Sequence, residues 1–218
     1  MPGLTDRYKK PARKSDAEEH GLKNNLIYDG LIYRVSDKEN DCTSFLDAGK
    51  IDSTSLYAKL MGKCNWDNLA NPRINFDWHH RRMFASMQIR NAFFRLAQKL
   101  TEEKQTTKAL DVLKKADKTM SLMNWPVDYQ SILLAGLYAR NEQKEMGKAK
   151  FQELSKSLEE WLYYYSGFPK NQKEAILEDA GYKLSLYNEL IKQASDTLSE
   201  TELKAMKEKL VLYAGKLS

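Results

Sequence analysis

Two histidines and several cations lie between residues 78 and 101, a stretch that contains no acidic residue. His79 and His80, followed by Arg81, could in principle bind phosphate or a metal ion. Adjacent side chains on a helix point about 100° apart, and no His, Cys or carboxylate follows at the spacing of one helical turn. The sequence therefore predicts no metal site here.

The remaining cations of this stretch follow the helical period. At about 100° per residue, Arg81, Arg95 and Lys99 fall on the outer face of the predicted helix, where basic side chains are commonly just solvated. The chain carries 35 basic and 30 acidic residues, for a net charge of +5. Binding of an acidic partner such as RNA through this face is therefore permitted by the charge balance and not required by it.

Arg90 has a different environment, because it falls in the apolar sector that contains Phe94 and Ala97. A buried guanidinium must find a carboxylate or carbonyl oxygens, since an unpaired buried charge is strongly destabilising. We predict a structural ion pair with Asp128, which opens a later helix. Asp117 is the alternative partner, and binding of an anionic ligand is the alternative role.

An aromatic block of sequence Trp-Leu-Tyr-Tyr-Tyr begins at Trp161. Helical spacing places Trp161 and Tyr165 in the core stripe and leaves Tyr163 and Tyr164 pointing elsewhere. We favour core and inter-repeat packing for the block, with a concave binding wall as the alternative. The candidate interaction surface consists of Arg81, Arg95, Lys99, Tyr163 and Tyr164.

No residue set in the chain demands a reaction. The sequence has no Gly-rich phosphate loop, no GxSxG elbow and no HExxH motif. Its two cysteines, Cys42 and Cys64, form no CxxC or Cys/His cluster of the kind that binds zinc. We therefore expect a chain that is not an enzyme and that has no catalytic residues, cofactor or metal ion.

The elements that must position these residues are mostly helical. We expect a short helix over residues 16–28, a strand over 31–35 and a helix from Asp52 to Gly62, and then longer helices. Longer helices are predicted over residues 78–100, 106–120, about 145–165 and about 171–195. Two further helices are predicted, one capped by Asp128 and one that begins at the Ser199 capping box and includes Leu217. We divide the chain into a flexible basic tail (1–15), a small helix/strand appendage (16–76) and a helical array (77–218).

Residues 93–116 have the pattern of one tetratricopeptide-type repeat. Large and small apolar residues line one face of each of two helices, and a polar break separates them. These residues are Phe93, Leu96, Ala97 and Leu100, followed by Ala109, Leu113 and Ala116. The apolar positions of the next two helices match each other less closely than those of this repeat, as expected if the turn between them were longer. The predicted fold is mainly α, an antiparallel array of tetratricopeptide-like helix pairs with a small mixed α/β appendage at the N-terminus.

Several short strings, in order from residue 21 to residue 165, resemble a bacterial family. The segments are residues 21–23, 29–35, 49–52, 65–66, 89–97, 108–113, 126–129 and 162–165. The family consists of multi-span membrane proteins with a GT-C-type glycosyltransferase region, similar to protein O-mannosyltransferases, which end in a soluble repeat-bearing domain. The resemblance implies a non-catalytic C-terminal domain and transfers no active site, since the membrane spans and the acidic catalytic loop of such enzymes are absent.

Together these patterns predict a helical-repeat scaffold or protein-interaction domain, accessory to a membrane glycosyltransferase-like protein. Its partner would be another protein or the membrane-embedded part of the same polypeptide. The chain has no run of the ~20 apolar residues that span a bilayer. We expect the periplasmic face of the inner membrane if the chain belongs to a longer membrane protein, and the cytoplasm otherwise. The alternative is a free-standing cytoplasmic module that binds RNA or another acidic partner, although nucleic acid is not the partner we favour.

Overall fold

The computed structural model describes residues 25–30, 32–37, 49–74, 76–77, 88–122 and 124–217. The predicted tail at residues 1–15 lies outside the described residues. The chain forms two compact units, Met1–Lys63 and Cys64–Ser218. Their boundary lies before the one predicted between residues 76 and 77, so the irregular segment that follows Lys63 belongs with the helices.

The first unit contains a three-stranded sheet of order β2-β1-β3. Strand β1 (Leu26–Tyr28) pairs antiparallel with β2 (Tyr33–Val35) and parallel with β3 (Lys50–Ile51). The prediction of helix as far as Tyr28 was wrong for residues 26–28. The Asp29-Gly30 pair ends no helix there, because it forms the turn of a hairpin, with Gly30 at a φ of 89°.

Helix α2 (Ser53–Tyr57) completes the first unit, and Asp52 caps it as predicted by accepting a hydrogen bond from the Ser55 amide. A wider helical turn, Ala58–Lys63, continues the helix past Gly62, where the sequence analysis ended it. Leu56 and Leu60 of this element are buried.

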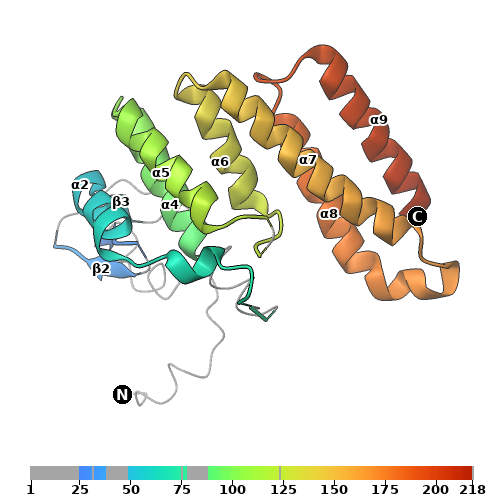
Figure 1. Cartoon of the computed structure of the whole chain (residues 1–218), viewed down its shortest axis with the longest axis horizontal. Coiled ribbons are helices and arrows are strands. Elements are labelled where there is room, and N and C mark those ends of the chain that lie inside the picture. Colours follow the sequence, from blue (N-terminus) through green and yellow to red (C-terminus); the bar gives the residue numbers. More distant parts are fainter. Residues whose placement is uncertain are drawn as a thin grey trace. The chain divides into compact units, whose positions relative to one another are not determined.

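The second unit is built from six helices within the described residues (Figure 1). Their bounds are α4 Asn91–Glu102, α5 Thr106–Thr119, α6 Tyr129–Arg140, α7 Lys144–Ser166, α8 Lys173–Gln193 and α9 Glu200–Leu217. The predicted helices agree with these bounds to within a few residues, except that residues 78–87 lie outside the described part. None of the described helices combines the length and the apolar character that a membrane span requires.

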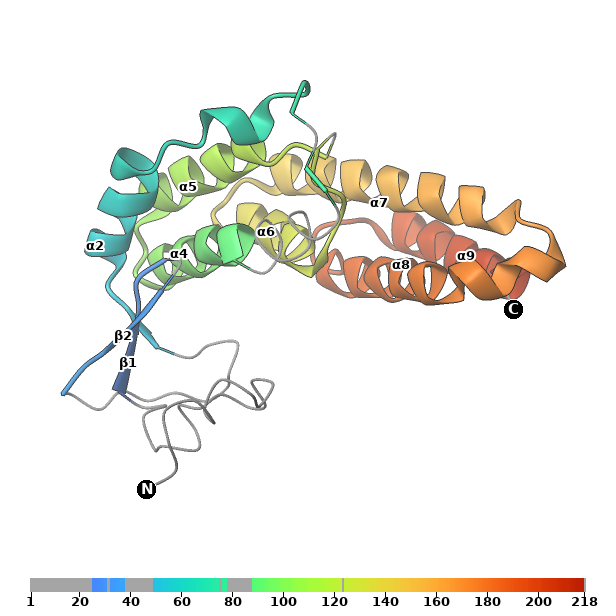
Figure 2. The same ribbon diagram turned by 90° about the horizontal axis from the view of Figure 1, so that it is seen from below.

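Consecutive helices pack in pairs, and the pairs pack on one another. Helix α4 contacts α5 and α6, α6 contacts α7 and α8, and α8 contacts α7 and α9. Figure 2 shows α4, α6 and α8 in one layer, with α5 and α7 in the other. Each amphipathic helix thereby buries its apolar residues against the other helix of its pair and against a helix of a neighbouring pair.

The turns inside the first two pairs are the same. Glu103–Gln105 joins α4 to α5, and Asn141–Gln143 joins α6 to α7. Lys104 and Glu142, the central residues, both have positive φ, at 57° and 65°. The amide of Gln105 donates to the Leu100 carbonyl at 2.8 Å, and the amide of Gln143 donates to Tyr138 at 2.9 Å. The longer turn expected in the second pair is therefore absent.

The core of the second half follows a continuous stripe on α7. Its members on this helix are Phe151, Leu154, Leu158, Leu162 and Tyr165. The prediction that Trp161 belongs to this stripe was wrong, because Leu162 is fully buried whereas 41% of Trp161 is exposed. Positions three and four residues after Leu158 both fall near the apolar sector, and the packing against α8 selects the second of them.

The segment before α4 is irregular, and its aromatic side chains anchor it to the helices as predicted. Trp66 packs on Phe93 with ring centroids 5.4 Å apart, and Phe76 packs on Trp125 at 4.5 Å. The Trp125 indole N–H donates to the Leu69 carbonyl at 2.9 Å. These contacts explain why the segment forms one unit with the helical array.

Candidate functional site

Arg90 and Asp128 form the buried ion pair that the sequence predicts. Nη1 of Arg90 lies 2.8 Å from Oδ2 of Asp128, and both side chains are almost fully buried. The guanidinium also donates to the carbonyl oxygens of Pro126 and Trp125, at 2.7 and 2.9 Å. These oxygens belong to Trp125, Pro126 and Asp128, which lie in the connection between α5 and the first residue of α6. One cation therefore fixes the path of the chain into α6.

Asp128 has a second role as the N-cap of α6. Its Oδ1 accepts from the Ser131 amide at 2.8 Å, and the Ser131 hydroxyl accepts from the Asp128 amide at 3.1 Å. This reciprocal capping box places a negative charge at the positive end of the helix dipole. Both carboxylate oxygens of Asp128 therefore have partners within the protein, Arg90 and the Ser131 amide. This favours the structural role of Arg90 over the binding of an external anion.

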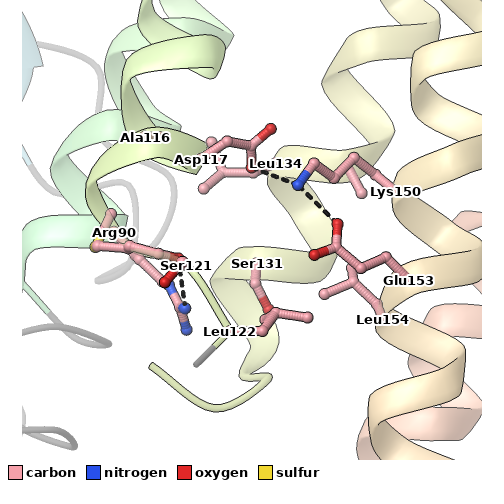
Figure 3. A pocket seen from close by; sticks show the side chains of 12 residues that line it. Arg90, Ala116, Asp117, Ser121, Leu122, Ser131, Leu134, Lys150, Glu153 and Leu154 are labelled. Carbon is pink, nitrogen blue, oxygen red and sulfur yellow. Dashed lines mark hydrogen bonds and ion pairs between the residues drawn. The ribbon is translucent and has the colours of Figure 1, made fainter. Parts of the chain in front are cut away.

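A small cavity of about 80 Å³ lies beside Arg90, between α5, α6 and α7 (Figure 3). Asp117 from α5 and two α7 residues, Lys150 and Glu153, line it. Nζ of Lys150 lies 3.3 Å from Asp117 Oδ1 and 2.8 Å from Glu153 Oε2. The Tyr138 hydroxyl donates to Asp117 at 2.6 Å. The charges that line the cavity are therefore already paired across three helices.

Burial perturbs the titration of this cluster. It raises the pKa of the Asp117 carboxyl, although the Tyr138 hydroxyl and the Lys150 ammonium both act in the opposite direction. Burial opposes the charged form of Lys150 as well, but the Glu153 and Asp117 carboxylates outweigh it and raise the pKa of Lys150. The cavity holds the volume of a few water molecules. We interpret the cluster as a polar connection between helix pairs.

Of the predicted basic face, the structure describes Arg95 and Lys99. Arg95 is 4% exposed, so its assignment to the outer face was wrong. Helix α4 packs against both α5 and α6, and this second contact covers a face that a single pair would leave open. Lys99 is partly exposed and lies 3.8 Å from carboxylate oxygens of Glu102 and Glu103. Arg81 lies outside the described residues, as do His79 and His80.

Exposed aromatic side chains instead gather where α7 ends and along α8. We define the α7–α8 aromatic surface as the exposed residues Trp161, Tyr163, Tyr164 and Tyr182 together with Phe168, which is partly buried against the core. Tyr163 and Tyr164, both predicted as surface residues, are 70% and 57% exposed, and Tyr182 is 45% exposed. Two pairs of these rings are in contact. Trp161 meets Tyr164 edge-on at 6.2 Å between ring centroids, and Tyr164 meets Phe168 at 5.2 Å.

An open groove runs along one part of this surface. Among the side chains that the structure describes, none that lines the groove is charged, although 30% of the chain's residues are charged. The lining residues are Tyr163, Tyr164, Ser166, Gly167, Phe168, Pro169 and Gln172. A concave, uncharged and aromatic surface of this kind suits the apolar side chains of a binding partner.

Lys183 lies at the other part of the aromatic surface, and the sequence analysis did not single it out. Only 9% of this residue is exposed, and its Nζ lies 5.8 Å from the ring centroid of Trp161 and 5.7 Å from that of Tyr182. Its position between Ala180 and Tyr187, at helical spacing in the α8 stripe, was the signal that could have identified a buried lysine.

Metal ligation has no support in the part of the chain that the structure describes, where no three His, Cys, Asp or Glu side chains gather in a suitable group. Cys64 is free and exposed. Comparisons of the chain with protein-family models, with curated proteins and with solved structures find no match.

Proposed function

We propose that this chain is a non-catalytic scaffold of tetratricopeptide-like helix pairs that binds a segment of a protein partner on the α7–α8 aromatic surface. The observation that carries the proposal is the exposure of Trp161, Tyr163 and Tyr164 on a helix whose opposite face is fully packed. Exposed aromatic clusters on a rigid frame are typical of protein interfaces, where Trp and Tyr contribute much of the binding energy.

The repeat character is supported by the two equivalent turns. Ala97 and Ala109 in the first pair have the same places relative to the turn as Ala135 and Gly147 in the second. A Cβ atom on Gly147 would lie 3.3 Å from the backbone nitrogen of Ala139, so α6 and α7 approach closely at this small residue. Such a pattern is what stacked helix-turn-helix repeats require.

Crosslinking from the aromatic surface tests the binding function. A photo-reactive amino acid at Tyr164 is expected to capture a protein partner in cells, whereas the same group at exposed Lys207 on α9 should not. The captured protein is then purified, and its affinity for the chain is measured with and without Tyr163→Ser and Tyr164→Ser. Because both tyrosines are exposed, the double variant should keep its fold and lose binding by at least about tenfold. Equal affinity would contradict the proposal.

We also propose, from the family resemblance, that the chain is an accessory domain of a membrane glycosyltransferase-like protein on the periplasmic side. The membrane-embedded part of the same polypeptide is then a candidate partner. Exposed Cys64 offers a direct test of sidedness. In a Cys42→Ser background, a membrane-impermeant maleimide should label Cys64 in intact spheroplasts that make the natural polypeptide. Labelling only after lysis would contradict the periplasmic location.

A further inference from the structure

Lys183 is a buried cation without a carboxylate partner. Within the part of the chain that the structure describes, it makes neither an ion pair nor a hydrogen bond, and its Nζ lies near the rings of Trp161 and Tyr182. Lys150, by contrast, is held by two carboxylates. Aromatic faces stabilise a cation only partly when it is removed from water.

The negative charges that act on the Lys183 ammonium do not fully offset the cost of its burial. Burial lowers the pKa of Lys183, and the more distant charges of Asp179 and Asp128 offset this only in part. Asp128 is already engaged by Arg90 and by its own helix cap. A buried charge of this kind is destabilising unless an opposite charge reaches it.

We propose that Lys183 receives a carboxylate of the partner, so that the α7–α8 aromatic surface binds a peptide segment that carries an Asp or Glu a few residues before an apolar side chain. This inference rests on the proposed function. Charge complementarity selects the carboxylate, and the uncharged groove lined by Tyr163, Tyr164 and Phe168 selects the apolar side chain. The rings of Trp161 and Tyr182 would flank the ion pair and exclude water from it.

The geometry of the surface sets the spacing, along the bound peptide, between its carboxylate and its apolar side chain. Lys183 lies 5.8 Å from the Trp161 ring, and Trp161 lies 6.2 Å from the Tyr164 ring at the groove. An extended chain advances about 3.3 Å per residue and places alternate side chains on the same face, so the apolar side chain follows about four positions after the carboxylate. An extended peptide is favoured over a phosphate-rich partner, because one buried cation among apolar rings offers no row of charges for a backbone of phosphates.

Two capped peptides and the full chain test the proposal. The first contains Glu, three Ala and Phe in that order, and the second replaces Glu with Gln. Binding is followed by chemical shifts of the Trp161 indole N–H in NMR titrations into the millimolar range. The Glu peptide should bind about tenfold more tightly than the Gln peptide, and Lys183→Met should remove this preference. Lys207→Met, an exposed lysine on α9, should leave it unchanged. Lys183→Met should melt at the same or a higher temperature, so loss of binding cannot be ascribed to unfolding.

The other outcomes separate the two proposals. If both peptides bind equally and shift the groove resonances, the aromatic surface binds protein segments but the carboxylate inference is overturned. If neither peptide binds and the captured partner is unaffected by Tyr163→Ser and Tyr164→Ser, the proposed function fails as well. If only a single-stranded oligothymidylate or phosphatidylglycerol vesicles bind, in a manner that depends on Lys183, the partner is a phosphate-bearing molecule and the peptide inference is wrong.

Discussion

Nη1 of Arg90 lies 2.8 Å from Oδ2 of Asp128, and this buried pair joins the residue before α4 to the residue that caps α6. The two residues are far apart in the sequence and belong to different helix pairs. Because Arg90 also holds the carbonyl oxygens of Trp125 and Pro126, the contact fixes the connection between the pairs as well as their packing.

Arg90→Ala is expected to lower the free energy of unfolding by roughly 3–5 kcal/mol, because it leaves Asp128 buried without its partner. Arg90→Met should lower it less, since the apolar stem remains although the acid is still unpaired. Urea unfolding of both variants measures the effect, and exposed Arg140→Ala serves as the control. Stability close to that of the natural chain in both variants would instead support an anion-binding role for Arg90.

Asp117→Asn tests the polar cluster between α5, α6 and α7. Burial raises the pKa of Asp117 above its usual 3.8, so the folded state binds the proton more tightly than the unfolded state does. As the pH falls through the folded pKa, the natural chain should gain stability relative to the variant, and the gain is complete below 3.8. Urea unfolding from about pH 7 downward measures this difference. A stability difference that is constant with pH would contradict the assignment.

Glu159 should show the opposite pH dependence. Burial alone would raise its pKa, but hydrogen bonds from Lys209, Tyr187 and Ser155 together lower it below its usual 4.5. These donors, at 2.7–2.9 Å, connect α7, α8 and α9. The stabilisation is therefore present above pH 4.5 and is lost as the pH falls through the lowered pKa.

Glu159→Gln accordingly should reduce the free energy of unfolding by about 1–3 kcal/mol at neutral pH, and by less in acid. The neighbouring exposed Glu160→Gln is the matched control, with an expected change within about 0.5 kcal/mol. Equal effects of the two substitutions would show that the three hydrogen bonds contribute nothing to the packing of the last helix pair.

The features that the sequence predicted best are those that local rules determine. Apolar spacing located the helices of the second unit, and Asp128 was identifiable as an N-cap from its own neighbourhood. The partner of Arg90 could be predicted because a cation within an apolar stripe has few ways to pair its charge. A capping carboxylate at the start of another helix was one of them.

The features that were missed depend on contacts between helix pairs. The helical period placed Arg95 on the outer face of α4, whereas the folded chain buries this residue and packs α4 against both α5 and α6. The choice between Trp161 and Leu162 as the core residue depends on how α8 crosses α7, which the period of one helix does not encode. Lys183 received no attention because a single lysine in an apolar stripe resembles many that bend out to solvent.

The last prediction concerns the close approach of α6 and α7 at Gly147. Helix propensity favours Ala over Gly by about 1 kcal/mol, so Gly147→Ala would stabilise an isolated helix. In this fold, however, the added Cβ would lie 3.3 Å from the Ala139 backbone nitrogen, which cannot yield without separating the two helices. We expect Gly147→Ala to lower the melting temperature, with a net loss of about 1 kcal/mol after propensity is included. Gly181→Ala, at an exposed position of α8, is the matched control, because nothing lies within 4 Å of its Cβ position, and it should raise the melting temperature. If both substitutions stabilise the chain, the helices of the second pair do not approach as closely as the structure has them.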